Sequence, residues 1–163
     1  MSRAFVKEDG NDLEPLPDLP ISPHPNYVTP TGLAALQARL LATQNQLAAL
    51  RARPDRLDKL PEAAAERDIR YLDARLRSAI LIDPATQPLT EVAFGLCVTV
   101  SDEDGIQTTY AIVGEDEADP ALHRIAPHSP LARAVFGARP GDVVRWNRPN
   151  RSVDLEIVEV TRP

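Results

Sequence analysis

The sequence has few of the features that mark several common classes of protein. It has a single cysteine, Cys97, so it cannot form a disulfide within the chain, which fits a reducing compartment. Aromatic residues make up only 4% of it, which argues against a surface that stacks nucleic-acid bases. It contains no run of about 18 apolar residues and no basic-then-apolar leader, so neither a membrane span nor a signal peptide is predicted. We therefore expect a soluble cytoplasmic protein.

Positive charge is also in the minority. The 163 residues carry a formal net charge of −6, so the chain as a whole is not built to bind nucleic acid through charge alone. The three histidines lack the spacing of zinc ligands, and no pairing of Ser or Cys with His indicates a nucleophile. The length suits one ordinary domain or two small ones.

What the sequence does contain begins with a proline-rich segment, residues 1–26. It holds five prolines, and five acidic residues against two basic ones. Such a composition cannot bury enough apolar surface to offset the entropy of ordering, so we predict a flexible, partly polyproline tail. The tail is interpreted as a solubilising extension, with a docking motif as the alternative.

A helical hairpin is predicted over residues 27–83. Thr29 is placed to cap a helix, with Pro30 at the first helical position, where its missing N–H is not needed. Apolar residues then recur with a heptad period in two arms of the same phase. The two seams consist of Leu33, Leu36, Leu40, Thr43, Leu47 and Leu50, and of Ala65, Ile69, Leu72, Leu76 and Ala79. Two such arms joined by a short polar break predict an antiparallel coiled coil.

The break between the arms is predicted to be the tip of the hairpin, over residues 53–60. Pro54 ends the first helix because it lacks a donor and disfavours helical geometry at the residue before it. Pro61 suits the first turn of the second helix. Asp55 and Asp58 therefore lie at the far end of arms of about 22 residues, or roughly 33 Å at 1.5 Å per residue.

For residues 84–163 the sequence predicts a small, mostly antiparallel sheet domain with one short helix. Together with the helical hairpin, this domain makes the predicted fold class α+β. The period changes to two, with strands indicated by VAFGLCVTV, QTTYAIVG, VVRWN and VDLEIVEV, and turns by SDEDG and EDEADP. The helix is SPLARAVFG, with Ser129 as its N-cap and Gly137 as its C-cap. Phe136 and Trp146 are predicted to be core aromatics.

Taken together, these segments resemble the bacterial Gre family of transcript-cleavage factors. The resemblance covers nearly all of residues 27–160 and is carried by YVTPTGLAAL, RSAILID, YAIVGEDEAD, SPLARAVFG, GDVV and LEIVEV in this order. It implies an N-terminal antiparallel coiled coil followed by an FKBP-like C-terminal domain. It also implies an accessory factor, itself no enzyme, that docks at the rim of the RNA polymerase secondary channel and inserts its hairpin toward the active centre.

For the tip, the resemblance implies two carboxylates that help to hold Mg²⁺ jointly with RNA polymerase and stimulate cleavage of backtracked RNA at the transcript 3′ end. Mg²⁺ takes carboxylate oxygens, and two-metal sites stabilise both the attacking and the leaving oxygen. These catalytic and metal-binding positions fall on Asp55 and Asp58. Here the family's glutamate is the shorter Asp58, its glycine is Pro54, and each arm is shorter by about one heptad, or roughly 10 Å. No cofactor bound tightly by the chain alone is expected.

The same resemblance assigns further contacts. The segment that docks on the polymerase rim matches Ser129, Pro130 and Arg133. Three arginines near the tip are predicted to contact RNA phosphates or the electronegative polymerase channel, with a solvated helix face as the alternative, namely Arg51, Arg53 and Arg56. A monomer without membrane contact is expected.

Several alternatives stay open. Asp55 and Asp58 could serve only as turn-capping residues, and the acidic pair could instead be Asp58 and Glu62. The shorter arms favour a second function, in which the protein binds the secondary channel without cleavage and modulates or inhibits RNA polymerase. A third is a prolyl isomerase or chaperone of FKBP-like fold, which is disfavoured because few aromatic residues are available to build an apolar proline pocket.

Overall fold

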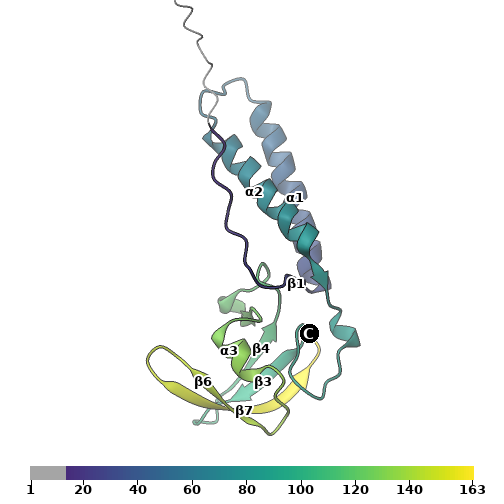
Figure 1. Ribbon diagram of the computed structural model, residues 1–163, viewed down its shortest axis with the longest axis vertical. Coiled ribbons are helices and arrows are strands. Elements are labelled where there is room, and N and C mark those ends of the chain that lie inside the picture. The colour runs from purple at the N-terminus through teal and green to yellow at the C-terminus, as the bar shows by residue number, and fades with distance from the viewer. Residues whose placement is uncertain (1–13) are drawn as a thin grey trace, which may run out of the picture.

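The computed structural model describes residues 14–163, which form a long helical hairpin and a small sheet domain at its base (Figure 1). The hairpin consists of α1 (Pro30–Arg51) and α2 (Leu60–Ser78). The sheet domain combines five strands with the short helix α3 (Pro130–Val135). The predicted α+β class, a hairpin followed by a sheet domain, is confirmed. Within residues 14–163 no helix is both long and apolar enough to cross a membrane.

The two helices of the hairpin pack through the predicted apolar seam. Leu36 and Leu47 of α1 are buried, as are Ala65 and Leu72 of α2. Full burial of one leucine stabilises a fold by about 1.5–3 kcal/mol. Because most helical stability in proteins comes from the packing of an apolar face, the seam rather than helix propensity holds the hairpin together.

The ends of the helices follow the predicted signals closely. Thr29 Oγ1 accepts a hydrogen bond from the N–H of Gly32 over 2.9 Å, which caps α1. The loop between the helices covers residues 52–59, one residue earlier than predicted, because Leu60 already belongs to α2. Pro61 lies in the first turn of α2 as expected.

The main sheet has the strand order β5-β4-β3-β7-β6, so β5 and β6 form its edges. Its strands are β3 (Cys97–Ser101), β4 (Gln107–Ile112), β5 (Arg124–Ile125), β6 (Val143–Asn147) and β7 (Ser152–Thr161). Neighbours are antiparallel except β4 and β5, which pair in parallel. The remaining elements are the parallel pair β1 (Tyr27–Val28) and β2 (Ile80–Leu81) and the 3₁₀ turns η1 (Pro84–Thr86) and η2 (Pro120–Leu122).

The first predicted strand is shorter than its alternating sequence indicates. β3 begins only at Cys97, although Val92 and Phe94 are buried as one face of a strand would be. Gly95 has a φ of 84°, a left-handed conformation that breaks an extended strand and that glycine adopts without a steric cost. A Cβ at this position would also lie 3.0 Å from Pro84 Cγ. The chain therefore enters the sheet after a turn.

The core of the domain lies between the sheet and α3. Its large, fully buried side chains are Val92, Leu96, Val98, Ile112, Val135 and Ile157. Trp146 packs against this core and is partly buried. Phe136 is 55% exposed, so the prediction that it is a core aromatic is wrong. Phe136 directly follows α3. The last residue of α3, Val135, packs in the core against the sheet in its stead.

Residues 14–26 lie along α2 rather than apart from the hairpin (Figure 1). The guanidinium of Arg70 donates to Asp18 Oδ1 over 2.6 Å and to the carbonyl oxygen of Leu16 over 2.8 Å. The prediction of a tail over residues 1–26 therefore needs correction, because this part contacts the hairpin. The first half of the predicted tail lies outside the described residues.

Candidate functional site

The tip of the hairpin carries the two aspartates that the sequence assigns to catalysis. Asp55 Oδ1 accepts a hydrogen bond from the N–H of Leu57 over 3.0 Å, and Asp58 Oδ1 accepts one from the N–H of Leu60 over 3.0 Å. Each carboxylate thus caps a turn two residues on, as aspartate commonly does in loops. Both residues are exposed, so capping the loop and contacting a partner are compatible roles.

The arginines near the tip bind groups of the chain itself. Arg51 donates to Glu66 over 2.6 Å and so links the two helices. Arg53 donates to the carbonyl oxygen of Asp58 over 3.2 Å, which braces the loop. The third, Arg56, also pairs with a carboxylate of the hairpin. The predicted contacts of these arginines with RNA or with the polymerase channel would therefore compete with internal bonds.

Glu62 provides the carboxylate that Arg56 binds. Its side chain is buried, and Arg56 donates to its two oxygens over 3.0 and 2.6 Å. This hydrogen bond with Arg56 lowers the pKa of Glu62 below its usual value. A metal ion shared by Asp58 and Glu62 would have to displace Arg56, so the geometry favours Asp55 and Asp58 as the acidic pair.

The donors at the tip can supply only part of a magnesium coordination shell. Mg²⁺ demands near-octahedral oxygen coordination and keeps several waters. Asp55 and Asp58 offer oxygens of the right chemistry, but no group of three or more His, Cys, Asp or Glu side chains within residues 14–163 could hold a metal ion. An ion at this tip would need ligands from another molecule.

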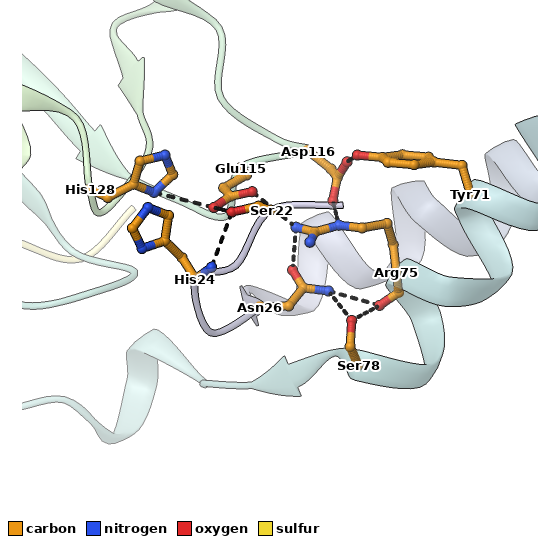
Figure 2. Close-up of polar contacts among 9 residues, drawn as sticks. All are labelled: Ser22, His24, Asn26, Tyr71, Arg75, Ser78, Glu115, Asp116 and His128. Carbon is orange, nitrogen blue, oxygen red and sulfur yellow. Dashed lines mark hydrogen bonds and ion pairs between the residues drawn. The ribbon is translucent and has the colours of Figure 1, made fainter. Parts of the chain in front are cut away.

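A second polar site joins the hairpin to the sheet domain, and Arg75 lies at its centre (Figure 2). The Arg75 guanidinium, on a residue only 1% exposed, donates to Asp116 over 2.6 Å and to Asn26 Oδ1 over 2.6 Å. Tyr71 donates its hydroxyl proton to the other oxygen of Asp116 over 2.6 Å. Burial and this hydrogen bond raise the pKa of Tyr71 to about 12. We name these four residues, together with Glu115, the junction cluster.

Glu115 extends the junction cluster toward the N-terminal segment and α3. It accepts a hydrogen bond from Ser22 Oγ over 2.8 Å and lies 3.2 Å from His128 Nδ1. The ring of His128 stacks on that of His24 with centroids 4.3 Å apart (Figure 2). Gly114 precedes this acidic turn, and a Cβ there would lie 2.5 Å from a backbone carbonyl oxygen. The sequence predicts only a turn for the stretch EDEADP, whereas its residues Glu115 and Asp116 contact Arg75 of the hairpin.

The residues assigned to polymerase docking lie together at the start of α3. Ser129 Oγ accepts a hydrogen bond from the N–H of Ala132 over 3.4 Å and caps the helix, as predicted. Pro130 follows the cap, and Arg133 is exposed. Arg133 and Phe136 border a hollow of about 580 Å³ whose walls come from the hairpin base and the sheet domain. The three residues predicted to dock are thus grouped, and each is at least partly exposed.

Comparisons with known proteins assign the chain to a family. The family described as "Transcription elongation factor, GreA/GreB, C-term" matches residues 87–162. The transcription elongation factor GreB of Neisseria meningitidis serogroup B is 34% identical over 156 residues, which covers 83% of this chain and 93% of that protein. The chain belongs to the GreA/GreB family. The resemblance stated from its sequence motifs is confirmed.

The chain is also similar to a second relative and to a solved structure. The transcription elongation factor GreA of a Psychrobacter species is 36% identical over 150 residues, covering 82% of this chain and 95% of that protein. Among solved structures, the GreA/GreB factor of Nitrosomonas europaea is 21% identical with a TM-score of 0.42, covering 83% of this chain and 98% of that chain. The roles of the tip aspartates and of the docking residues stay predictions.

Proposed function

We propose that this GreA/GreB family chain is a transcription elongation factor that acts on RNA polymerase and is not itself an enzyme. Its relatives bear that function in their names. The sheet domain docks on the polymerase through Ser129, Pro130 and Arg133, and the hairpin enters the secondary channel. The observation that carries the proposal is the acidic pair at the far end of the hairpin, whose helix α1 has 22 residues. At 1.5 Å per residue this helix spans roughly 33 Å.

At the active centre, Asp55 and Asp58 would present carboxylate oxygens to a Mg²⁺ ion held jointly with RNA polymerase. When bound, such an ion activates water and stabilises the oxygens of an in-line displacement at phosphorus. The chain itself contributes positioning, because the turns capped by the two aspartates and the neighbouring pair of Arg56 and Glu62 fix the loop. A prepositioned carboxylate loses less entropy when the site assembles. The outcome is stimulated cleavage of backtracked RNA at its 3′ end.

The proposal is tested with halted elongation complexes that carry 3′-labelled backtracked RNA in the presence of Mg²⁺. We expect the protein to release short 3′ fragments, and Asp55→Ala or Asp58→Ala to slow this release by at least about tenfold, the lower range for perturbed metal sites. Asp83→Ala is the matched control, because exposed Asp83 also caps a turn two residues on, at the N–H of Ala85. Equal cleavage by all four proteins would refute a metal-binding role for the tip.

The turns at the tip also favour a second candidate, a protein that occupies the secondary channel and modulates or inhibits RNA polymerase without cleavage. Asp55 and Asp58 each use one oxygen to cap the loop, a role that needs no metal. In this case no fragments are released, the protein still competes with a known cleavage factor for the polymerase, and the alanine variants compete as well as the wild type.

A prolyl isomerase or chaperone activity is the weakest alternative, because a fold does not carry an activity. A peptide isomerisation assay with and without the protein tests it directly. The cytoplasmic location and the monomeric state predicted from the sequence also belong to this proposal. A sizing experiment at several protein concentrations tests the monomer.

A further inference from the structure

The sheet domain carries a concentration of arginine that the proposed contacts leave unexplained. Between residues 124 and 151 there are six arginines and one acidic residue, although the whole chain has a net charge of −6. That acidic residue, Asp142, already accepts a hydrogen bond from the backbone N–H of Arg139 over 2.8 Å. We name the five arginines from α3 onward the arginine surface, which consists of Arg133, Arg139, Arg145, Arg148 and Arg151.

Most of this charge has no intramolecular counter-charge. Arg145 pairs with Asp154 over 2.9 and 3.3 Å. Within the described part of the chain, no carboxylate forms an ion pair with any of the other four guanidinium groups. All five arginines are exposed. Uncompensated charge of one sign in one part of the chain favours an anionic partner, because such a partner neutralises it.

A polar hollow connects two of these arginines. It has a volume of about 380 Å³ and lies between α3 and β6. Arg133 of α3 and Arg145 of β6 line it, together with Pro130 and Asn147. Guanidinium groups present planar arrays of donors that match carboxylates, so a hollow with two of them suits an acidic side chain.

An apolar hollow adjoins the polar one. It has a volume of about 410 Å³, and its walls include Tyr110, Leu131 and Trp146. Pro130 and Asn147 border both hollows, so the two are neighbours on one surface. Aromatic and arginine side chains around an apolar hollow are the composition typical of protein interfaces.

The strand beside the hollows is an edge of the sheet. β6 pairs with β7 on one side and has no second strand neighbour in the described sheet. Val143 of β6 is 66% exposed. Edge strands with accessible apolar side chains accept extended segments of other chains.

The aromatic residues argue against a nucleic acid as the ligand. The guanidinium of Arg148 lies over the Trp146 ring, 4.5 Å from its centroid, and so covers a face that a base would need. The ring of Tyr110 contacts His123, with centroids 5.2 Å apart.

We infer that the arginine surface binds an acidic, extended protein segment that carries an apolar anchor residue, and that this segment belongs to RNA polymerase. The carboxylates of the segment contact the arginines, and its apolar side chain fills the hollow beside Trp146. The inference rests on the proposed binding to RNA polymerase. It adds the chemistry of the partner and extends the contact from Arg133 to the turn between β6 and β7.

The test measures the Kd of the full chain for purified RNA polymerase at several salt concentrations. We expect the double variant Arg148→Glu/Arg151→Glu to bind at least about tenfold more weakly, mainly through a slower association rate. Its Kd should also depend less on salt, because exposed charges are screened. The matched control Arg77→Glu/Arg162→Glu makes the same change in net charge at two exposed arginines outside the arginine surface.

The possible outcomes separate this inference from the proposed function. No binding of the wild type would overturn both. Equal binding by the wild type and the glutamate variant would overturn the inference and leave the proposed function standing. Loss of binding to a DNA duplex without loss of binding to the polymerase would identify a nucleic-acid site and overturn the inference.

A charge-conserving variant guards against a folding defect. Arg148→Lys/Arg151→Lys keeps the positive charge but loses the planar donor array and the stacking of Arg148 on Trp146, so we expect its Kd to lie between those of the wild type and the glutamate variant. The circular dichroism spectra of both variants should match that of the wild type. If the lysine variant binds as weakly as the glutamate variant, binding does not depend on the positive charge at these positions, and the inference is overturned.

Discussion

Most arginines of the hairpin and most of those in the sheet domain lie in opposite electrostatic surroundings. Between positions 51 and 75, every arginine of the hairpin pairs with a carboxylate, and these are Arg51, Arg53, Arg56, Arg67, Arg70 and Arg75. In the arginine surface, Arg145 alone does so within residues 14–163. The same residue type therefore serves two purposes in one chain.

The difference matches what each region has to do in the proposed function. A hairpin that enters a channel must keep its shape, and its internal pairs fix the loop, the two helices and the base. Pairs at exposed positions contribute little to stability, so an exposed arginine can stay unpaired at small cost. Free guanidinium groups are then available to a partner. Substitutions in three places, taken from the largest expected effect to the smallest, test this contrast.

The largest expected effect is at the junction cluster. Arg75→Met removes a guanidinium on a residue that is 1% exposed and leaves Asp116 without its cation. Breaking a buried pair from one side costs about 3–5 kcal/mol, because the remaining charge stays buried. We expect a loss of this size in the free energy of unfolding, measured by urea denaturation.

Arg70→Met is the matched control for this prediction. The pair of Arg70 with Asp18 has the same length, 2.6 Å, but its side chains are 40% and 74% exposed. An exposed pair contributes less than about 1 kcal/mol. Similar losses for the two variants would mean that burial does not distinguish the junction from the rest of the hairpin.

A smaller effect, dependent on pH, is expected at the tip. The hydrogen bond with Arg56 holds the pKa of Glu62 below its ordinary value of 4.5. A carboxylate with a lowered folded pKa contributes stability that is fully present above the unfolded pKa and is lost as the pH falls through the folded pKa. Thermal unfolding followed by circular dichroism should show wild-type stability falling more steeply than that of Glu62→Gln below pH 4.5. Parallel profiles for the two proteins would contradict a role for the Arg56 pair in stability.

The hairpin could be predicted from the sequence because its signals are local. The cap at Thr29 lies next to the helix that it starts, and the period that buries Leu36 and Leu72 repeats along each arm. Two prolines delimit the loop, which places Asp55 and Asp58 at the tip. Each of these signals acts over a few residues, and the packing of the folded hairpin agrees with all of them.

The junction cluster could not be predicted because its partners are distant in sequence. Arg75 and Asp116 are 41 residues apart, and an acidic stretch after a strand has the composition of an ordinary turn. Phe136 was misassigned for a related reason. Phe136 is hydrophobic, but a hydrophobic residue is buried only if its position faces the core. Whether position 136 faces the sheet depends on how α3 packs, which the local sequence does not show.

The smallest expected effect is in the arginine surface, and it is the sharpest test of the contrast. Arg151 is exposed and pairs with no carboxylate within residues 14–163. Arg151→Gln should therefore change the free energy of unfolding by less than about 0.5 kcal/mol. Arg148→Gln should cost slightly more, about 0.5–1 kcal/mol, because its guanidinium lies over Trp146. A loss at Arg151 as large as that of Arg75→Met would make the arginine surface part of the folded framework, and its charge would not be free to bind a partner.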